Sequence, residues 1–453
     1  MKRSVPGIPA NKWMLLSFLS LLLLASPLAA GRAQGAEFYW STGFHLSQEY
    51  NDNIYLENDS EDPEDDWITV LSQSFTLGIR TEEFDTSLNF SIGYAHYQER
   101  EDSGDIRGDI DLSGFRDIPI TENWVLSLDE SFSITEDPIE FGPAADPEQE
   151  PYYSSHEERT RYYRNQFRGE LAYQFGEGNA FYWGYGNSLL QTSSDTIQDS
   201  MQHRPFAGVR YGFGVRHAID LGMNYTKAEF DQTQRDEEDD VSDFDGWGGS
   251  ASYLFRMDPE TNWNLTYSIA ERDFESEADS DYRTHNFSLG VSRQLSETLS
   301  ASAHVGYFRQ EVDNGESNSG PSASLSLSKQ FEVGTLQLSG SMGIREQYIE
   351  AQNLGASEYR RVQASYGFQA AENLNVSLGA GWFENEYLQA ENRTDDSTWY
   401  GNASLSYQVL EWLNTRLTYT HHERNADVEE DEYKVNRVML MFSIPYEGEP
   451  VIF

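Results

Sequence analysis

The stretch LNVSLGAGW, residues 374–382, alternates without a break between apolar side chains and small or polar ones. Successive side chains of an extended strand point to opposite faces of a sheet, so this stretch would form a strand with one apolar and one polar face. The same alternation recurs along almost the whole chain after residue 37. Clear examples are residues 74–80, 88–95, 322–328, 336–342 and 404–409. The pattern therefore predicts an all-β protein.

Two β architectures produce this alternation, a soluble sandwich and a membrane-spanning barrel. The alternating segments run for about 13 to 16 residues, whereas strands of globular proteins commonly have about 5 to 6. Their polar faces are rich in Ser, Gly, Asn, Gln and Arg, although acidic residues dominate the chain as a whole. Aromatic pairs such as Tyr94/Tyr97 and Trp399/Tyr400 gather at segment ends, as in the interfacial belts of membrane barrels. We therefore predict a transmembrane antiparallel β-barrel.

The connections between these segments alternate in length. Short turns, such as residues 80–84 and 213–216, alternate with longer polar links, such as 51–65 and 136–158. This is the pattern of a barrel with short periplasmic turns and long extracellular loops. Counting the links predicts about 20 strands, within a range of about 16 to 20, and an even number lets the sheet close without a free edge. The proline-rich link 136–158 could fold into the barrel and narrow it, or remain outside as a lid.

The composition excludes several classes of protein. The 453 residues include 76 Asp and Glu against 31 Lys and Arg, a formal charge of -45, and no cysteine. A surface of this sign repels nucleic acid, and the lack of cysteine excludes disulfides and thiolate metal sites. Disordered acidic chains are poor in aromatic residues, whereas 14% of this chain is aromatic.

The first 33 residues have the layout of a secretory signal peptide. Lys2, Arg3 and Lys12 precede the apolar run WMLLSFLSLLLL, and small residues follow it. The apolar run is shorter than the roughly 20 residues that a membrane-spanning helix needs. We predict cleavage between about residues 30 and 36. The barrel is expected to occupy residues 37–453.

Residues 47–56 read SQEYNDNIYL, and residues 66–69 read DWIT. This segment resembles the opening of the outer-membrane β-barrel porin families of proteobacteria, some of which are encoded with exopolysaccharide biosynthesis and export machinery. The resemblance implies an outer-membrane barrel with a saccharide or exopolysaccharide solute and polysaccharide export machinery as a partner. It transfers no catalytic residues. The chain departs from the pattern in its acidic segment 57–66 and in Phe453, which Glu447–Pro450 separates from the last alternating segment.

Arginines recur on the polar faces of the predicted strands. They could line a passage that favours anionic solutes, as rings of Arg or Lys do in anion pores. Alternatively, they could form a structural network with acidic residues of neighbouring strands. Both interpretations place them inside the barrel, because a lipid-facing Arg at the bilayer midplane costs about 2–4 kcal/mol. The candidates are Arg80, Arg168, Arg210, Arg345, Arg361, Arg416 and Arg437.

The acidic runs 57–66, 236–240 and 427–432 fall in predicted extracellular loops. They could bind divalent cations that bridge them to lipopolysaccharide, or they could be solvated loops. None has the spacing of an EF-hand, so no metal site is assigned.

Catalytic motifs are missing from the sequence, which contains neither H-E-x-x-H nor G-x-S-x-G. His304 shares a predicted strand face with Ser302, but serine is too abundant for this pairing to carry weight. We expect no enzyme and no cofactor. The expected function is a passive channel for a saccharide or exopolysaccharide in the outer membrane of a Gram-negative bacterium. A non-conducting docking barrel of a secretion system, and an outer-membrane lipid or glycan hydrolase, remain as alternatives.

Overall fold

The computed structural model describes residues 36–452 except 59, 61, 83, 101–103, 114–117, 137–138, 141–151, 154–159, 194–197, 232–241, 277–279, 314, 348–354 and 389–394. The predicted signal peptide lies outside the described residues, and so does most of the link 136–158. Within the described part of the chain, no helix is long and apolar enough to cross a membrane.

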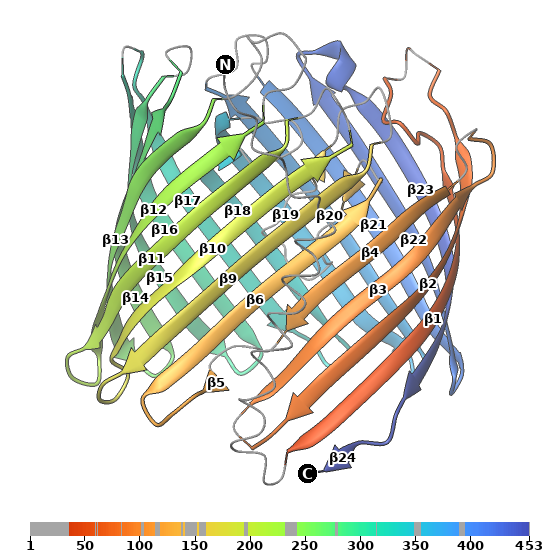
Figure 1. The fold of residues 1–453 in the computed structure, drawn as a ribbon, viewed down its shortest axis with the longest axis horizontal. Helices are drawn as coiled ribbons and strands as arrows, with labels where there is room; N and C mark the ends of the chain where they lie inside the picture. Colours follow the sequence, from red (N-terminus) through yellow and green to blue (C-terminus); the bar gives the residue numbers. More distant parts are fainter. Residues whose placement is uncertain are drawn as a thin grey trace, which may run out of the picture.

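Twenty long antiparallel strands form one closed sheet (Figure 1). Each strand pairs with its neighbours in sequence, and β1 pairs with both β2 and β23, which closes the barrel. The predicted antiparallel barrel of about 20 strands is thus confirmed. The strands are β1 (Glu37–Asn51), β2 (Asp66–Arg80), β3 (Asp85–Tyr97), β4 (Gly104–Ser113), β6 (Trp124–Thr135), β9 (Tyr162–Gln174), β10 (Ala180–Thr192), β11 (Ser200–Gly212), β12 (His217–Phe230), β13 (Phe244–Asp258), β14 (Thr261–Phe274), β15 (Tyr282–Ser296), β16 (Leu299–Val312), β17 (Asn318–Gln330), β18 (Gly334–Gln347), β19 (Gly355–Ala371), β20 (Leu374–Tyr387), β21 (Asp395–Leu410), β22 (Leu413–Ala426) and β23 (Tyr433–Glu447).

Four two-residue strands accompany the barrel. β5 (Ile118–Pro119) pairs with β6, and β24 (Val451–Ile452) pairs with the start of β1. The chain therefore returns to the barrel after residues 448–450, and the C-terminal residues extend the junction between the first and last strands. β7 (Ile139–Glu140) and β8 (Tyr152–Tyr153) pair only with each other among the described residues.

The outer face of the sheet is apolar. Leu71, Val305 and Leu325 expose 61%, 61% and 58% of their surface, and they share this face with many other large apolar side chains. Exposed apolar surface on this scale is unfavourable in water, so the outer face requires an apolar environment. Aromatic side chains lie at both ends of this face, with Trp40 against Tyr446 near the short turns and Trp382 against Trp399 nearer the long links. These ends are called the turn end and the link end below.

Carboxylates satisfy backbone groups along the rim of the link end. Asp199, Asp243 and Asp281 each stand directly before a strand that descends from the rim. Their side chains accept the backbone N–H of the last residue of the preceding strand, at 2.8, 2.7 and 2.7 Å. Terminal N–H groups of a strand that lack a partner are costly, so these acidic side chains stabilise the rim.

The same three residues also connect neighbouring hairpins. Their backbone carbonyls accept N–H groups from the hairpin that follows, at 3.0, 2.8 and 2.8 Å. The donors are Asp231, Glu275 and Asp313. Part of the acidity of the chain is therefore structural, because it lies in side chains that hold the rim together.

Candidate functional site

The strand register defines which residues line the inside of the barrel. Side chains opposite one another across neighbouring strands share a face, and the large exposed apolar residues mark the outer one. The register places all seven candidate arginines on the other, inner face. These residues are Arg80, Arg168, Arg210, Arg345, Arg361, Arg416 and Arg437.

The seven arginines have different partners. Arg80, Arg168 and Arg210 pair with carboxylates at 2.8, 3.1 and 3.0 Å. Arg416 donates to the Ser406 hydroxyl at 3.0 Å. Part of the set therefore lies in ion pairs, as the network interpretation expects, while Arg416 faces a neutral partner.

The remaining three lie nearer the link end, and two of them contact neutral side chains. Arg345 donates to Asn385 Oδ1 at 2.5 Å, and the Arg361 guanidinium lies 5.0 Å from the centroid of the Phe383 ring. Arg437 is buried. All three make additional interactions.

Sequence reasoning missed six further arginines on the inner faces of the described strands, of which Arg107, Arg164 and Arg256 lie on β4, β9 and β13. Arg204 and Arg272 lie on β11 and β14, and Arg424 lies on β22. Arg204 lies an even number of positions from Arg210 in the same strand, so the alternation already placed both side chains on one face. The neighbouring Pro205, and the charged residues around Arg272, obscured the alternation.

Arg424 forms the centre of a buried polar cluster near the link end. It has no exposed surface in its side chain, and it donates to Asp396 Oδ2 through Nε at 3.1 Å and through Nη2 at 2.6 Å. Asn385 and Tyr387 also donate to the Asp396 carboxylate, both at 2.7 Å. Two N–H groups of Arg424 thus converge on one oxygen of a carboxylate that has further donors, and such additional hydrogen bonds help a buried ion pair to offset its desolvation cost.

The segment that carries the family resemblance locks the junction between β1 and β23. The Asp52 carboxylate accepts the backbone N–H of Asn436 at 2.6 Å and its side-chain amide at 2.7 Å. Asn53 closes a turn by accepting the N–H of Glu57 at 2.9 Å, and it donates to the carbonyl of Lys434. The contacts with Asn436 and Lys434 join residues that are more than 380 positions apart in sequence.

Leu56 completes this structure on the inside of the barrel. It is fully buried against Tyr433 and Val435, which belong to the inner face of β23. Its φ of 60° is a strained conformation for a branched residue, and burial of the side chain offsets that strain. The first link therefore bends inward over the last strand.

The inner wall differs sharply in charge from one side to the other. The inner face of β4 carries Asp105, Arg107, Asp109 and Asp111. The inner faces of β15, β16 and β17 carry no Asp, Glu, Lys or Arg along their described lengths. β4 and β17 are the fourth and fourteenth of the 20 strands in order around the barrel, so the charged and neutral walls face each other.

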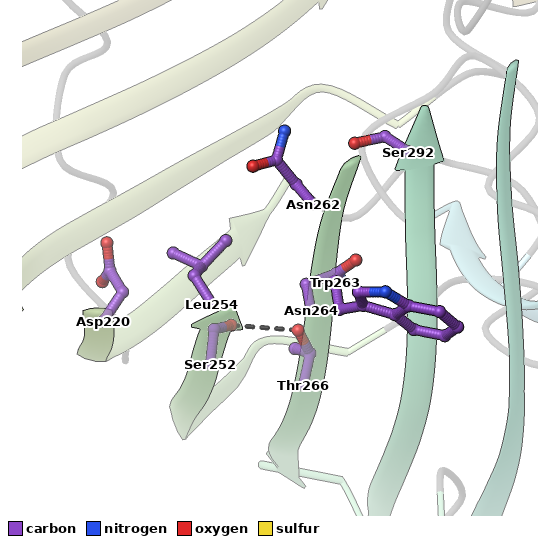
Figure 2. Close-up of a pocket in the computed structure, with 8 residues that line it drawn as sticks. All are labelled: Asp220, Ser252, Leu254, Asn262, Trp263, Asn264, Thr266 and Ser292. Carbon is purple, nitrogen blue, oxygen red and sulfur yellow. Dashed lines mark hydrogen bonds between the residues drawn. The ribbon is translucent and has the colours of Figure 1, made fainter. Parts of the chain in front are cut away.

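The neutral side is lined by hydroxyl and amide groups, which we call the hydroxyl-amide wall. Its members on β15–β17 include Asn286, Ser288, Ser292, Ser302, Ser324 and Ser326. The wall is grooved, and one groove of about 270 Å³ lies at its edge. Figure 2 shows residues that line it, among them Asp220, Ser252 and Thr266, and the hydroxyls of the last two are 3.0 Å apart. A neighbouring groove of about 350 Å³ is lined by Ser302, Ser326 and further residues of β14–β17, and by Pro259 and Glu260 of the turn before β14.

The histidines of the described strands have separate neighbours. His304 Nδ1 lies 3.1 Å from the Ser324 hydroxyl, and Ser302 bonds to Ser326 instead. The described residues contain no cluster of three or more His, Cys, Asp or Glu side chains placed to hold a metal ion.

Comparisons with known proteins agree with this architecture. The sequence profile of the family described as "Putative beta-barrel porin 2" matches residues 186–445, more than half of the chain. No curated protein matches the chain in sequence.

The chain is also similar to solved structures from Pseudomonas aeruginosa. The outer membrane protein OpdK is 12% identical with a TM-score of 0.40, and 90% of this chain and 99% of OpdK are covered. OccK2 (OpdF), solved in complex with glucuronate, is 14% identical with a TM-score of 0.40, covering 90% and 98%. The siderophore receptor PirA is 11% identical with a TM-score of 0.47, covering 89% and 80%. On the family match, the chain belongs to the family "Putative beta-barrel porin 2" and forms a porin-like barrel channel of the bacterial outer membrane.

Proposed function

We propose that this channel passes a saccharide, including exopolysaccharide, across the outer membrane. The observation that carries the proposal is the hydroxyl-amide wall, whose strands β15–β17 present no formal charge to the lumen along their described lengths. Sugar hydroxyls both donate and accept hydrogen bonds, and Ser, Thr, Asn and Gln side chains offer both functions in return.

The strength of these contacts suits transport. A hydrogen bond that replaces one with water contributes about 0.5–1.5 kcal/mol, so a sugar would exchange partners along the wall without being held at one point. Conduction needs a site that is favourable enough to enter and weak enough to leave. The grooves at Ser252 and at Ser302 give a ring shallow places to rest.

The test is current block in a planar bilayer. Purified protein is expected to give stepwise conductance, and maltohexaose, a neutral probe, is expected to interrupt it. Replacing Ser302, Ser324 and Ser326 together by alanine should weaken block about threefold to tenfold, from three lost hydrogen bonds in a wet lumen. Ser41→Ala provides the control substitution. Ser41 also lies on the inner face, but on β1, which pairs with β2 and β23 and lies away from the hydroxyl-amide wall.

Three outcomes separate the candidate functions. Conductance that neither maltohexaose nor an acidic oligosaccharide blocks would contradict the saccharide assignment. If the protein migrates on a gel as a folded barrel but gives no stepwise conductance in the bilayer, the result would favour the docking barrel of a polysaccharide secretion system. Cleavage of maltohexaose or of lipid during the assay would favour a hydrolase.

Lipopolysaccharide and polysaccharide export machinery are the partners that we propose. On the outer face, Lys227, Arg309 and Arg360 pair with carboxylates at 2.5, 3.0 and 2.5 Å. Cations in this position, above an apolar belt, support contact with the phosphates of lipopolysaccharide. Co-purification of lipopolysaccharide with the barrel, and its loss when the three cations become glutamine, is the measurement.

A further inference from the structure

Three arginines of the inner face stand in one row across six neighbouring strands. The register places the following residues side by side, from β9 to β14: Arg168, Gly186, Arg204, Thr226, Gly246 and Arg272. We propose that the guanidinium row, defined as Arg168, Arg204 and Arg272, binds acidic groups of the saccharide in transit. This inference rests on the proposed function and narrows the solute to an anionic saccharide.

Two of the residues between the arginines are glycines, so no side chain fills the space beside the guanidinium groups at these positions. Neighbouring strands are about 4.8 Å apart, so the backbones of Arg168 and Arg204 are separated by roughly 10 Å, with a glycine between them. A methyl group at Gly186 would find only ordinary contacts, the nearest being the Phe167 carbonyl at 3.7 Å. At Gly246 a methyl group would collide with the carbonyl oxygen of Glu271, so no side chain can stand there.

The charges along the row are unevenly compensated. Arg168 pairs with Glu170 at 3.1 Å, and Arg272 pairs with Glu346 at 2.7 Å. Arg204, between them, contacts Asn224 Oδ1 at 3.4 Å and pairs with no carboxylate of the described residues. It is exposed to the lumen, where the like charges of Arg168 and Arg272 and the opposite charge of Glu346 act on it.

The carboxylates nearby lie at the ends of the row. Asp129 of β6 stands opposite Arg168, at one end, and Glu346 binds Arg272 at the other. An anion at Arg204 would therefore meet a guanidinium that no described carboxylate pairs with directly, although the charge of Glu346 acts on it from the end of the row. Arginine holds carboxylate, sulfate or phosphate oxygens through two parallel N–H groups, so each of these substituents on a sugar would fit.

An aromatic surface lies next to the row. The Phe206 ring is two residues from Arg204 on the same face of β11, and the guanidinium of Arg168 lies 4.0 Å from its centroid. This contact orients Arg168 over the ring. Together, the ring, the glycine and the guanidinium groups form a surface with both an apolar and a cationic part, which matches a sugar ring that carries an acidic group.

Two hexasaccharides of equal length test the inference. Hexagalacturonate carries a carboxylate on each sugar, and maltohexaose carries none. Arg204→Gln is expected to weaken block by hexagalacturonate about fivefold, the effect of one charge-assisted contact in a hydrated lumen, and to leave block by maltohexaose unchanged. Arg204→Lys should restore part of the loss, because it keeps the charge without the forked geometry.

Arg256→Gln is the matched control. Arg256 lies opposite Asn262 on the inner face of β13 at the turn end, so this variant loses the same charge away from the row. If Arg204→Gln and Arg256→Gln weaken block by hexagalacturonate equally, the effect comes from the overall charge of the lumen, and the proposed site is overturned. Unchanged block in Arg204→Gln would overturn it too. If neither hexasaccharide blocks the wild-type channel, the proposed function itself fails. Block by maltohexaose alone leaves that function standing and overturns the guanidinium row.

Discussion

Removing the Asp52 carboxylate is expected to open the junction between the first and last strands. In Asp52→Ala, two hydrogen bonds to a charged acceptor are lost, those from the backbone N–H of Asn436 at 2.6 Å and from its amide at 2.7 Å. Such bonds contribute about 1.5–3 kcal/mol each. Because the pair is only part-buried, the lower value applies to both, which gives about 3 kcal/mol in total.

The unfolding rate is the suitable measurement, since large proteins often unfold irreversibly. Folded barrels migrate faster than unfolded chains on a gel that is not heated, so the half-life of the fast band at a fixed temperature reports unfolding. If the junction opens before the other strands separate, a loss of about 3 kcal/mol shortens that half-life about 100-fold.

Glu316→Ala provides the control, because it removes one carboxylate from another long link, where Glu316 is exposed. Equal half-lives for the Asp52 and Glu316 variants would refute the idea that the acidic motif locks the barrel closed. A shorter half-life for Asp52→Ala alone would assign the motif a structural role.

Three further predictions use the same gel assay. Arg424→Met should destabilise the barrel by about 3–5 kcal/mol, because Asp396 becomes a buried, unpaired charge, and a second change of Asp396→Asn should recover part of the loss; no recovery would contradict the pairing. Asp243→Ala should cost about 1 kcal/mol through the lost acceptor at the rim, and no change in half-life would mean that water replaces it. Val305→Arg should cost about 2–4 kcal/mol on the outer face, whereas Ser302→Arg on the inner face should be tolerated, and equal costs would refute the assignment of faces.

The sequence was sufficient for the barrel because alternation is a local signal. In residues 374–382, side chains of both faces can be sorted from the chain alone, and the strand β20 follows that sorting. The length of the links was equally readable, since turns and links differ in composition.

The site was less predictable because it depends on pairing between strands. Arg204 and Arg272 are separated by three strand-to-strand steps, two short turns and one long link, and only the register brings them into one row. Similarly, nothing local indicates that Leu56 turns inward onto Tyr433 and Val435, since that contact depends on closure of the barrel. Long-range geometry, and not propensity, decides both features.

The aspartates of the link-end rim also bear on how the barrel is assembled. The carboxylates of Asp199, Asp243 and Asp281 accept hydrogen bonds within their own hairpins, and their backbone carbonyls accept hydrogen bonds from the hairpin that follows. The hydrogen bonds at the rim of one hairpin are therefore complete only after the next hairpin in sequence has paired with it. Contacts between neighbours in sequence form fastest, so this arrangement favours growth one hairpin at a time, with the finished edge serving as the template for the next.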